Sequence, residues 1–155
     1  MNKEILDDIN TLIIAVVLMK IREIVRVDNK GRITIPLIIR EALDIREGMS
    51  VLLIADTEKR ELIVSPISEE AKLFEIEIEI EDRPGALAEV ANELARHSID
   101  QVMTRCTTLR RGEIAECIMV VDTSKSAITT EKELENLIKN LRPIRIVKVR
   151  AFQKG

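Results

Sequence analysis

A short basic segment carries the clearest candidate chemistry of this 155-residue chain. Between positions 20 and 40 it has six cationic side chains and two acidic ones, a local charge of +4 in a chain whose net charge is −3. Lysine and arginine bind phosphate oxygens and release counterions, and arginine also contacts guanine edges in the major groove. The segment therefore predicts contacts with double-stranded DNA, and the alternative is ordinary solubilising charge on a surface turn. The residues expected to make these contacts are Arg22, Arg26, Lys30, Arg32 and Arg40.

A second candidate site lies where a strand pattern changes into a helical one, at Asp82-Arg83-Pro84-Gly85-Ala86-Leu87. The first turn of a helix offers free N–H groups and a positive dipole end to a carboxylate. Glycine lets a ligand approach the backbone closely, and an aspartate can receive an ammonium group. We therefore expect an amino acid here, with its carboxylate on the N–H groups of Gly85, Ala86 and Leu87. The alternative is a strand-to-helix turn that binds nothing.

Catalytic and metal chemistry are not indicated. The sequence shows no nucleophile–base pair, phosphate loop or Cys/His cluster, so we expect no enzymatic activity, cofactor or metal ion. Cys106 and Cys117 would face each other across a hairpin if Arg111 and Gly112 formed a two-residue loop. We expect them to be small buried side chains rather than a redox pair. Few cysteines and no long apolar run indicate a cytoplasmic protein without a membrane span.

The elements that position the basic residues are two predicted hairpins joined by a helix. The strands are expected at 20–27, 32–35, 50–55 and 61–64, with turn residues at 28–31 and 56–60. Pro36 ends the second strand and can begin a short helix that includes Leu37, Ile38, Leu43 and Ile45. Residues 1–18 precede this domain, and their apolar spacing predicts a helical extension packed on the body or on a partner chain.

The stretch VRVDNKGRITIPLIIREALDIREGMSVLLI, residues 25–54, resembles the AbrB/SpoVT-like looped-hinge family. The resemblance implies a swapped-hairpin domain over 19–66, in which hairpins of two chains interlock into one β-barrel. Many family members are DNA-binding transcription regulators and others are antitoxins. It also implies that Gly31 permits the tight turn, that Lys30 and Arg32 project from it, and that Arg40 matches a basic position of the linking helix.

Residues 72–152 predict a second domain. Phe74 to Ile80 alternates apolar and glutamate residues, which is typical of a half-buried strand. A helix at 86–97, strands at 99–107 and 114–121, a helix at 131–141 and a strand at 144–151 complete a ferredoxin-like βαββαβ order. Lys148 and Arg150 on the last strand are placed to pair with the glutamate row.

The stretch LFEIEIEIEDRPGALAEVANELARHSID, residues 73–100, resembles ACT domains, which are small-molecule regulatory modules that often bind amino acids. The resemblance implies a ligand at a dimer interface near the D-R-P-G turn, with Gln101 and Met103 of a partner chain closing the site. The fold class is therefore α+β, and the chain is interpreted as a homo-oligomeric DNA-binding regulator that senses an amino acid. The alternatives are a regulatory subunit of a metabolic enzyme and an antitoxin-like protein-binding module.

Overall fold

The computed structural model describes residues 20–152, so the predicted helix at 1–18 lies outside the described residues. The chain divides into two compact units, residues 1–49 and residues 50–155, and each is described by itself. No helix within residues 20–152 is long and apolar enough to cross a membrane.

The first unit contains a turn and a short helix. The helix α2, Leu37–Ala42, begins after Pro36, as the sequence predicts. The strands predicted at 20–27 and 32–35 are wrong for the single chain, because these residues form no strand. Only the turn between them closes, where the Asp28 N–H donates to the Arg32 carbonyl at 2.9 Å. An isolated two-stranded hairpin is marginal in water, and within residues 20–152 no strand pairs with this segment.

The second unit contains a hairpin followed by a four-stranded domain. Strands β1, Val51–Asp56, and β2, Glu61–Pro66, pair antiparallel in the hairpin that the sequence predicts. The remaining elements follow in the order β3 (Leu73–Glu81), α3 (Ala86–Arg96), β4 (Asp100–Arg110), β5 (Ile114–Asp122), α4 (Glu131–Lys139) and β6 (Ile144–Ala151). The α+β class and the βαββαβ order are confirmed.

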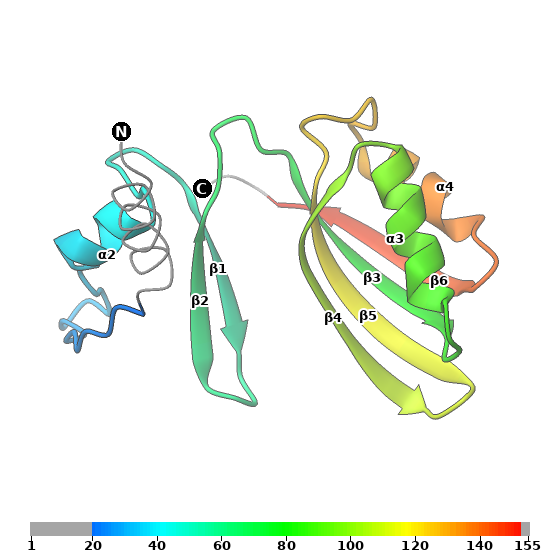
Figure 1. Cartoon of the computed structure of the whole chain (residues 1–155), viewed down its shortest axis with the longest axis horizontal. Helices are drawn as coiled ribbons and strands as arrows, with labels where there is room; N and C mark the ends of the chain where they lie inside the picture. The colour runs from blue at the N-terminus through cyan, green and yellow to red at the C-terminus, as the bar shows by residue number, and fades with distance from the viewer. Residues whose placement is uncertain (1–19, 153–155) are drawn as a thin grey trace, which may run out of the picture. The chain divides into compact units, whose positions relative to one another are not determined.

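The antiparallel sheet has the order β4-β5-β3-β6, and α3 and α4 cover one of its faces (Figure 1). Apolar residues of β3 alternate into this covered face, where Ile76 and Ile78 are almost fully buried with Leu94 and Leu134 of the two helices. The glutamates of β3 lie on the other face, and Arg150 pairs there with Glu75 and Glu77, as predicted for the last strand.

The base of the hairpin packs on the face of the sheet that the helices leave open. Leu52 of β1 is buried with Ala71, Leu73 and Val120, and Met103 packs against the same cluster. Because apolar burial is worth about 25 cal/mol per Å² of surface, this small cluster fixes the hairpin base to the sheet. Among the described residues, the hairpin and the βαββαβ domain therefore share a core.

A disulfide joins Cys106 of β4 to Cys117 of β5, which corrects the expectation of two small buried side chains. Cys117 is fully buried, whereas Cys106 is exposed on the edge strand. The two residues lie directly opposite in register. The loop between the strands spans 111–113 rather than two residues, and a register shift between Thr108 and Arg110 restores the alignment.

Candidate functional site

The turn of the basic segment is organised by the carboxylate of Asp28. Its Oδ1 atom accepts the backbone N–H groups of Lys30 and Arg32, each at 2.9 Å. The Gly31 N–H donates to the Asp28 carbonyl at 3.0 Å, and Gly31 adopts a φ of +75°, a conformation that glycine allows at little cost. The turn therefore holds its backbone in one shape and presents Lys30 and Arg32 from it.

Arg32 is engaged by the same aspartate. Its Nε atom donates to Asp28 Oδ2 at 2.8 Å, and a terminal guanidinium nitrogen lies 2.7 Å from that oxygen. Hydrogen bonds from the Arg32 backbone and side chain hold the pKa of Asp28 below its usual value. The Arg32 side chain is still 69% exposed, so its remaining N–H groups face solvent. Arg32 is thus a positioned cation whose charge is partly compensated in the free chain.

Arg40 is tied to the backbone instead. Its Nε atom donates to the Ile35 carbonyl at 3.1 Å, and the side chain is half-buried. This bond links α2 to the residue before Pro36. It therefore fixes the direction in which the chain enters the helix. A guanidinium has several donors, so a phosphate contact by the outer N–H groups is compatible with this role.

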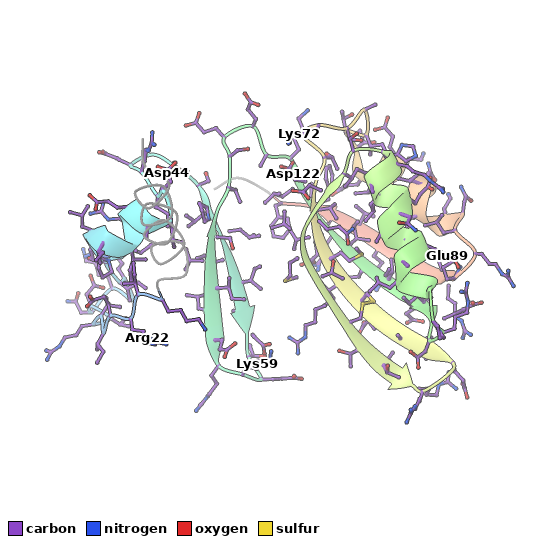
Figure 2. The ribbon with its side chains drawn as sticks, in the orientation of Figure 1. Arg22, Asp44, Lys59, Lys72, Glu89 and Asp122 are labelled. Atoms are coloured by element: carbon purple, nitrogen blue, oxygen red, sulfur yellow. A yellow bond between two sulfur atoms is a disulfide. The ribbon has the colours of Figure 1, made fainter. Side chains whose placement is uncertain are left out.

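The other predicted DNA contacts are free of protein partners within residues 20–152. The side chains of Arg22, Arg26 and Lys30 are exposed and make no hydrogen bond or ion pair in that part of the chain. Figure 2 labels Arg22 on the segment that leads to the turn. These three cations carry uncompensated charge, which is the property that phosphate binding needs.

At the second candidate site, the polar side chains have partners within the chain. Asp82 Oδ2 accepts the Gly112 N–H at 2.7 Å, and Oδ1 accepts the Thr108 hydroxyl at 3.4 Å. The Asp82 carboxylate therefore holds the turn between β4 and β5. An ammonium group would have to share this carboxylate with two donors that the sequence did not reveal.

Arg83 bridges two glutamates beside this turn. It donates to Glu81 at 2.7 Å from Nε and to Glu89 of α3 at 2.9 Å from a terminal nitrogen. The Arg83 side chain lowers the pKa of Glu81 mainly through its hydrogen bond. Figure 2 labels Glu89 on α3. This bridge fixes the start of the helix and leaves Pro84 and Gly85 exposed between its members.

The start of α3 keeps free donors for an anion. Gly85 is the N-cap in a left-handed conformation with a φ of +87°, and no side chain caps the helix. The Ala86 N–H donates to the Arg83 carbonyl at 3.2 Å. Within the described residues the N–H groups of Gly85 and Leu87 have no protein acceptor. Two of the three predicted carboxylate donors are thus open to a ligand.

Gln101 and Met103 lie at the far end of the sheet from the 82–87 turn of the same chain. The register pairs Gln101 with Val121, whereas Glu81 pairs with Ile114 at the other end of β5. Met103 also packs against the cluster beneath β1. One chain therefore does not bring the two halves of the predicted site together.

A cavity of about 840 Å³ opens at the far end of the sheet from the 82–87 turn. Its walls are largely apolar and include Leu52, Leu73, Phe74 and Phe152, with Lys72 among the polar lining residues. Lys72 and Asp122 meet at this end, where the Lys72 N–H donates to the carboxylate at 2.9 Å (Figure 2). Sequence reasoning missed this cavity because its walls come from segments far apart in the chain.

Residues 24–72 match the family model described as antidote-toxin recognition MazE, bacterial antitoxin. The N-terminal domain is MazE/AbrB-like. The matched residues contain the Asp28–Arg32 turn, α2 and both strands of the hairpin, so the likeness covers the whole basic turn. No curated protein matches the chain.

Two solved structures resemble the C-terminal βαββαβ domain. An uncharacterized protein from Thermotoga maritima is 20% identical with a TM-score of 0.41, over 54% of this chain and 99% of its own. The C-terminal domain of the MgtC protein from Mycobacterium tuberculosis is 12% identical with a TM-score of 0.42, over 56% of this chain and 93% of its own. Neither likeness indicates a ligand or an activity.

Proposed function

We propose that the protein is a cytoplasmic, DNA-binding transcription regulator whose C-terminal domain senses an amino acid. The observation that carries this proposal is the group of uncompensated cations around an ordered turn. Arg22, Arg26 and Lys30 are exposed and unpaired within the described residues, and Arg32 is held beside them. The match to the MazE family over residues 24–72, which include Arg26, Lys30 and Arg32, supports a regulatory role.

Binding to DNA would use a homo-oligomer. Apolar side chains in the first unit are exposed in the single chain, among them Ile24 at 100%, Val27 at 67% and Leu37 at 60%. Exposed apolar side chains that form a patch mark a site of protein–protein contact. A second copy of the segment would cover them and supply the strand neighbours that residues 20–27 and 32–35 lack. It would also double the number of phosphate-binding cations.

The effector would bind at the start of α3, where the free N–H groups of Gly85 and Leu87 suit a carboxylate. Asp82 would take the ammonium group, Arg83 and Pro84 would border the site, and Gln101 and Met103 of a partner chain would close it. The cavity at the far end of the sheet is a second place for an effector, because its lining includes Ser50 and Leu52 at the base of the hairpin.

A second candidate function is an antitoxin-like protein that binds a toxin. The description of the matching family favours it, and the exposed apolar residues of α2 and the hairpin suit a protein partner. A third candidate function is that of a regulatory subunit of a metabolic enzyme, in which the C-terminal domain contacts the enzyme.

Capture of genomic DNA fragments by the purified chain, with and without a panel of amino acids, tests the proposal. A regulator recovers a restricted set of fragments whose yield changes with one amino acid. Recovery of no fragments, together with stoichiometric capture of a toxin or an enzyme by the same protein, would replace it with one of the other two functions.

A further inference from the structure

The Cys106–Cys117 disulfide lies on an edge strand and is open to solvent on one side only. The strand order β4-β5-β3-β6 places β4 at the edge of the described sheet. Cys106 is exposed there, while Cys117 is 0% exposed and belongs to the core cluster with Ile78, its neighbour on β3. Cys106 is therefore the residue of the pair that a thiolate from solvent approaches, because Cys117 is enclosed in the core.

The residue before Cys106 holds the tip of the β1–β2 hairpin. Arg105 donates to Asp56 at 2.9 Å and to Glu58 at 3.1 Å, across a separation of 49 and 47 residues. Successive residues of a strand point to opposite faces, so Arg105 reaches the hairpin while Cys106 lies on the face of the helices. One short stretch of β4 thus carries both the disulfide and the contact with the hairpin tip.

The hairpin tip depends on this contact more than the hairpin base does. The base is packed by Leu52 and its apolar neighbours. Beside Arg105, by contrast, a cavity of about 210 Å³ separates the turn from the sheet, and its walls include Thr57, Thr107 and Glu116. At the tip, therefore, the hairpin is joined to the sheet by ion pairs across an open space, and not by packed apolar side chains.

The regular pairing of β4 in this region is short. Register shifts occur between Gln101 and Met103 and again between Thr108 and Arg110. The disulfide fastens the segment between these irregularities to β5 covalently. Without the bond, the segment would lose its covalent link to β5, and edge strands lack a second neighbouring strand.

We propose that Cys106 and Cys117 form a reversible thiol–disulfide pair that controls how firmly the hairpin tip is held by Arg105. Exposed disulfides are the labile and regulatory ones. The exchange partners are low-molecular-weight or protein thiols and their disulfides. The site is separate from the basic turn and from the 82–87 turn, and the proposal does not depend on DNA binding.

The exchange balances without any other reactant. In reduction, one thiolate of a dithiol attacks the Cys106 sulfur, the bond to Cys117 breaks, and Cys117 leaves as a thiolate that takes up a proton. The second thiolate of the reagent then attacks the reagent sulfur of the mixed disulfide. Cys106 leaves as a thiolate that takes up a proton. The protein gains two thiols and the dithiol becomes a disulfide. In oxidation, Cys106 attacks an external disulfide first, and Cys117 resolves the mixed disulfide.

Dithiothreitol titration of the native full-length chain, followed by alkylation and mass spectrometry, tests the exchange. We expect reduction without denaturant, with Cys106 alkylated before Cys117, and a glutathione adduct on Cys106 that persists in a Cys117→Ala variant. Reduction only in denaturant, or no bond between the two sulfurs in the air-oxidised protein, would overturn the proposal.

Hydrogen exchange of the oxidised and reduced protein tests the coupling to the hairpin. Amides of residues 56–61 should exchange faster after reduction. Arg105→Ala should give the fast exchange in both states, so that reduction has no further effect there. Arg110→Ala is the matched control, because that arginine pairs with Glu113 within its own turn. Equal exchange of residues 56–61 in oxidised and reduced wild type would show that the bond is only structural.

Discussion

Arg32 and Asp28 form a closed pair across the basic turn, with the Arg32 Nε 2.8 Å from one carboxylate oxygen. The other oxygen of Asp28 accepts two backbone N–H groups of the turn. One side chain thus shapes the turn and compensates a predicted DNA contact. Because the pKa of Asp28 is lowered, the carboxylate stays charged to a lower pH than an ordinary aspartate does. The stabilisation of the turn is present above the ordinary carboxyl pKa and is lost as the pH falls through the lowered value.

The Asp28→Asn substitution separates these two roles. The amide oxygen can still accept the N–H groups of Lys30 and Arg32, but the ion pair with Arg32 is lost. We expect tighter binding to duplex DNA, with a salt slope that steepens by about 0.9 for one added phosphate contact. Fluorescence anisotropy at several salt concentrations measures both quantities.

Asp44→Asn is the matched control for this substitution. Asp44 is an exposed aspartate of the same unit, and its partner is Arg46 at 2.8 Å. The control changes the net charge by the same amount and also releases an arginine. If it increases affinity and slope as much as Asp28→Asn does, the effect is one of general charge and Arg32 has no special place.

Arg40 should matter for stability as well as for binding. Removal of its hydrogen bond to the Ile35 carbonyl should lower the free energy of unfolding by about 1 kcal/mol in Arg40→Ala. Arg40→Lys keeps the charge but lacks Nε, so it should lose similar stability while retaining more DNA affinity. Urea denaturation measures the first property. Arg46→Ala, which removes an exposed ion pair, should leave stability nearly unchanged.

Asp82→Asn tests the effector site without opening the β4–β5 turn. The amide oxygen can still accept the Gly112 N–H, but the charge that would meet an ammonium group is gone. We expect loss of amino-acid binding by calorimetry, loss of the ligand effect on DNA, and unchanged basal DNA affinity. An amino acid that binds wild type and Asp82→Asn equally would move the site elsewhere, and the cavity lined by Phe152 is the next place to test.

Association through the first unit should be visible in solution. The full-length chain should sediment as a dimer or tetramer, because Leu37 and Ile38 are 60% and 49% exposed in the single chain. Replacement of both by serine should shift the protein towards smaller species while the βαββαβ domain keeps its circular dichroism. A wild-type monomer at micromolar concentration would contradict the interpretation that a second copy covers these apolar side chains.

The C-terminal domain was predictable because its signals are local. Alternation from Phe74 to Ile80 defines β3, and the change at Pro84 and Gly85 defines the start of α3. The strands at 20–27 and 32–35 were wrong for one chain because their apolar pattern describes surfaces that a single copy leaves uncovered. Strand pairing is a tertiary property, and the segment alone does not supply the neighbour.

Several contacts that the sequence did not reveal are long-range. Asp82 meets Gly112 across 30 residues, and Arg105 meets Asp56 across 49. Charged residues of both signs are common in this sequence. Residue type alone therefore does not indicate which of them will meet. The sequence predicted that Cys106 and Cys117 face each other only if the loop between their strands had two residues. The loop is longer in the structure, and the register shift before Arg110 still places the two cysteines opposite each other.

The most direct test of DNA binding by the basic segment is the salt dependence of affinity for mixed-sequence duplex DNA. The Arg22→Ala/Arg26→Ala/Lys30→Ala triple variant should weaken binding, and its salt slope should fall by about 2.7 for three lost phosphate contacts. A control triple variant, Lys125→Ala/Lys132→Ala/Lys139→Ala, removes the same charge from exposed positions of the C-terminal domain and should keep the wild-type slope. Equal slopes for the wild type and the first variant, or equal losses in both variants, would contradict the assignment of DNA binding to this segment.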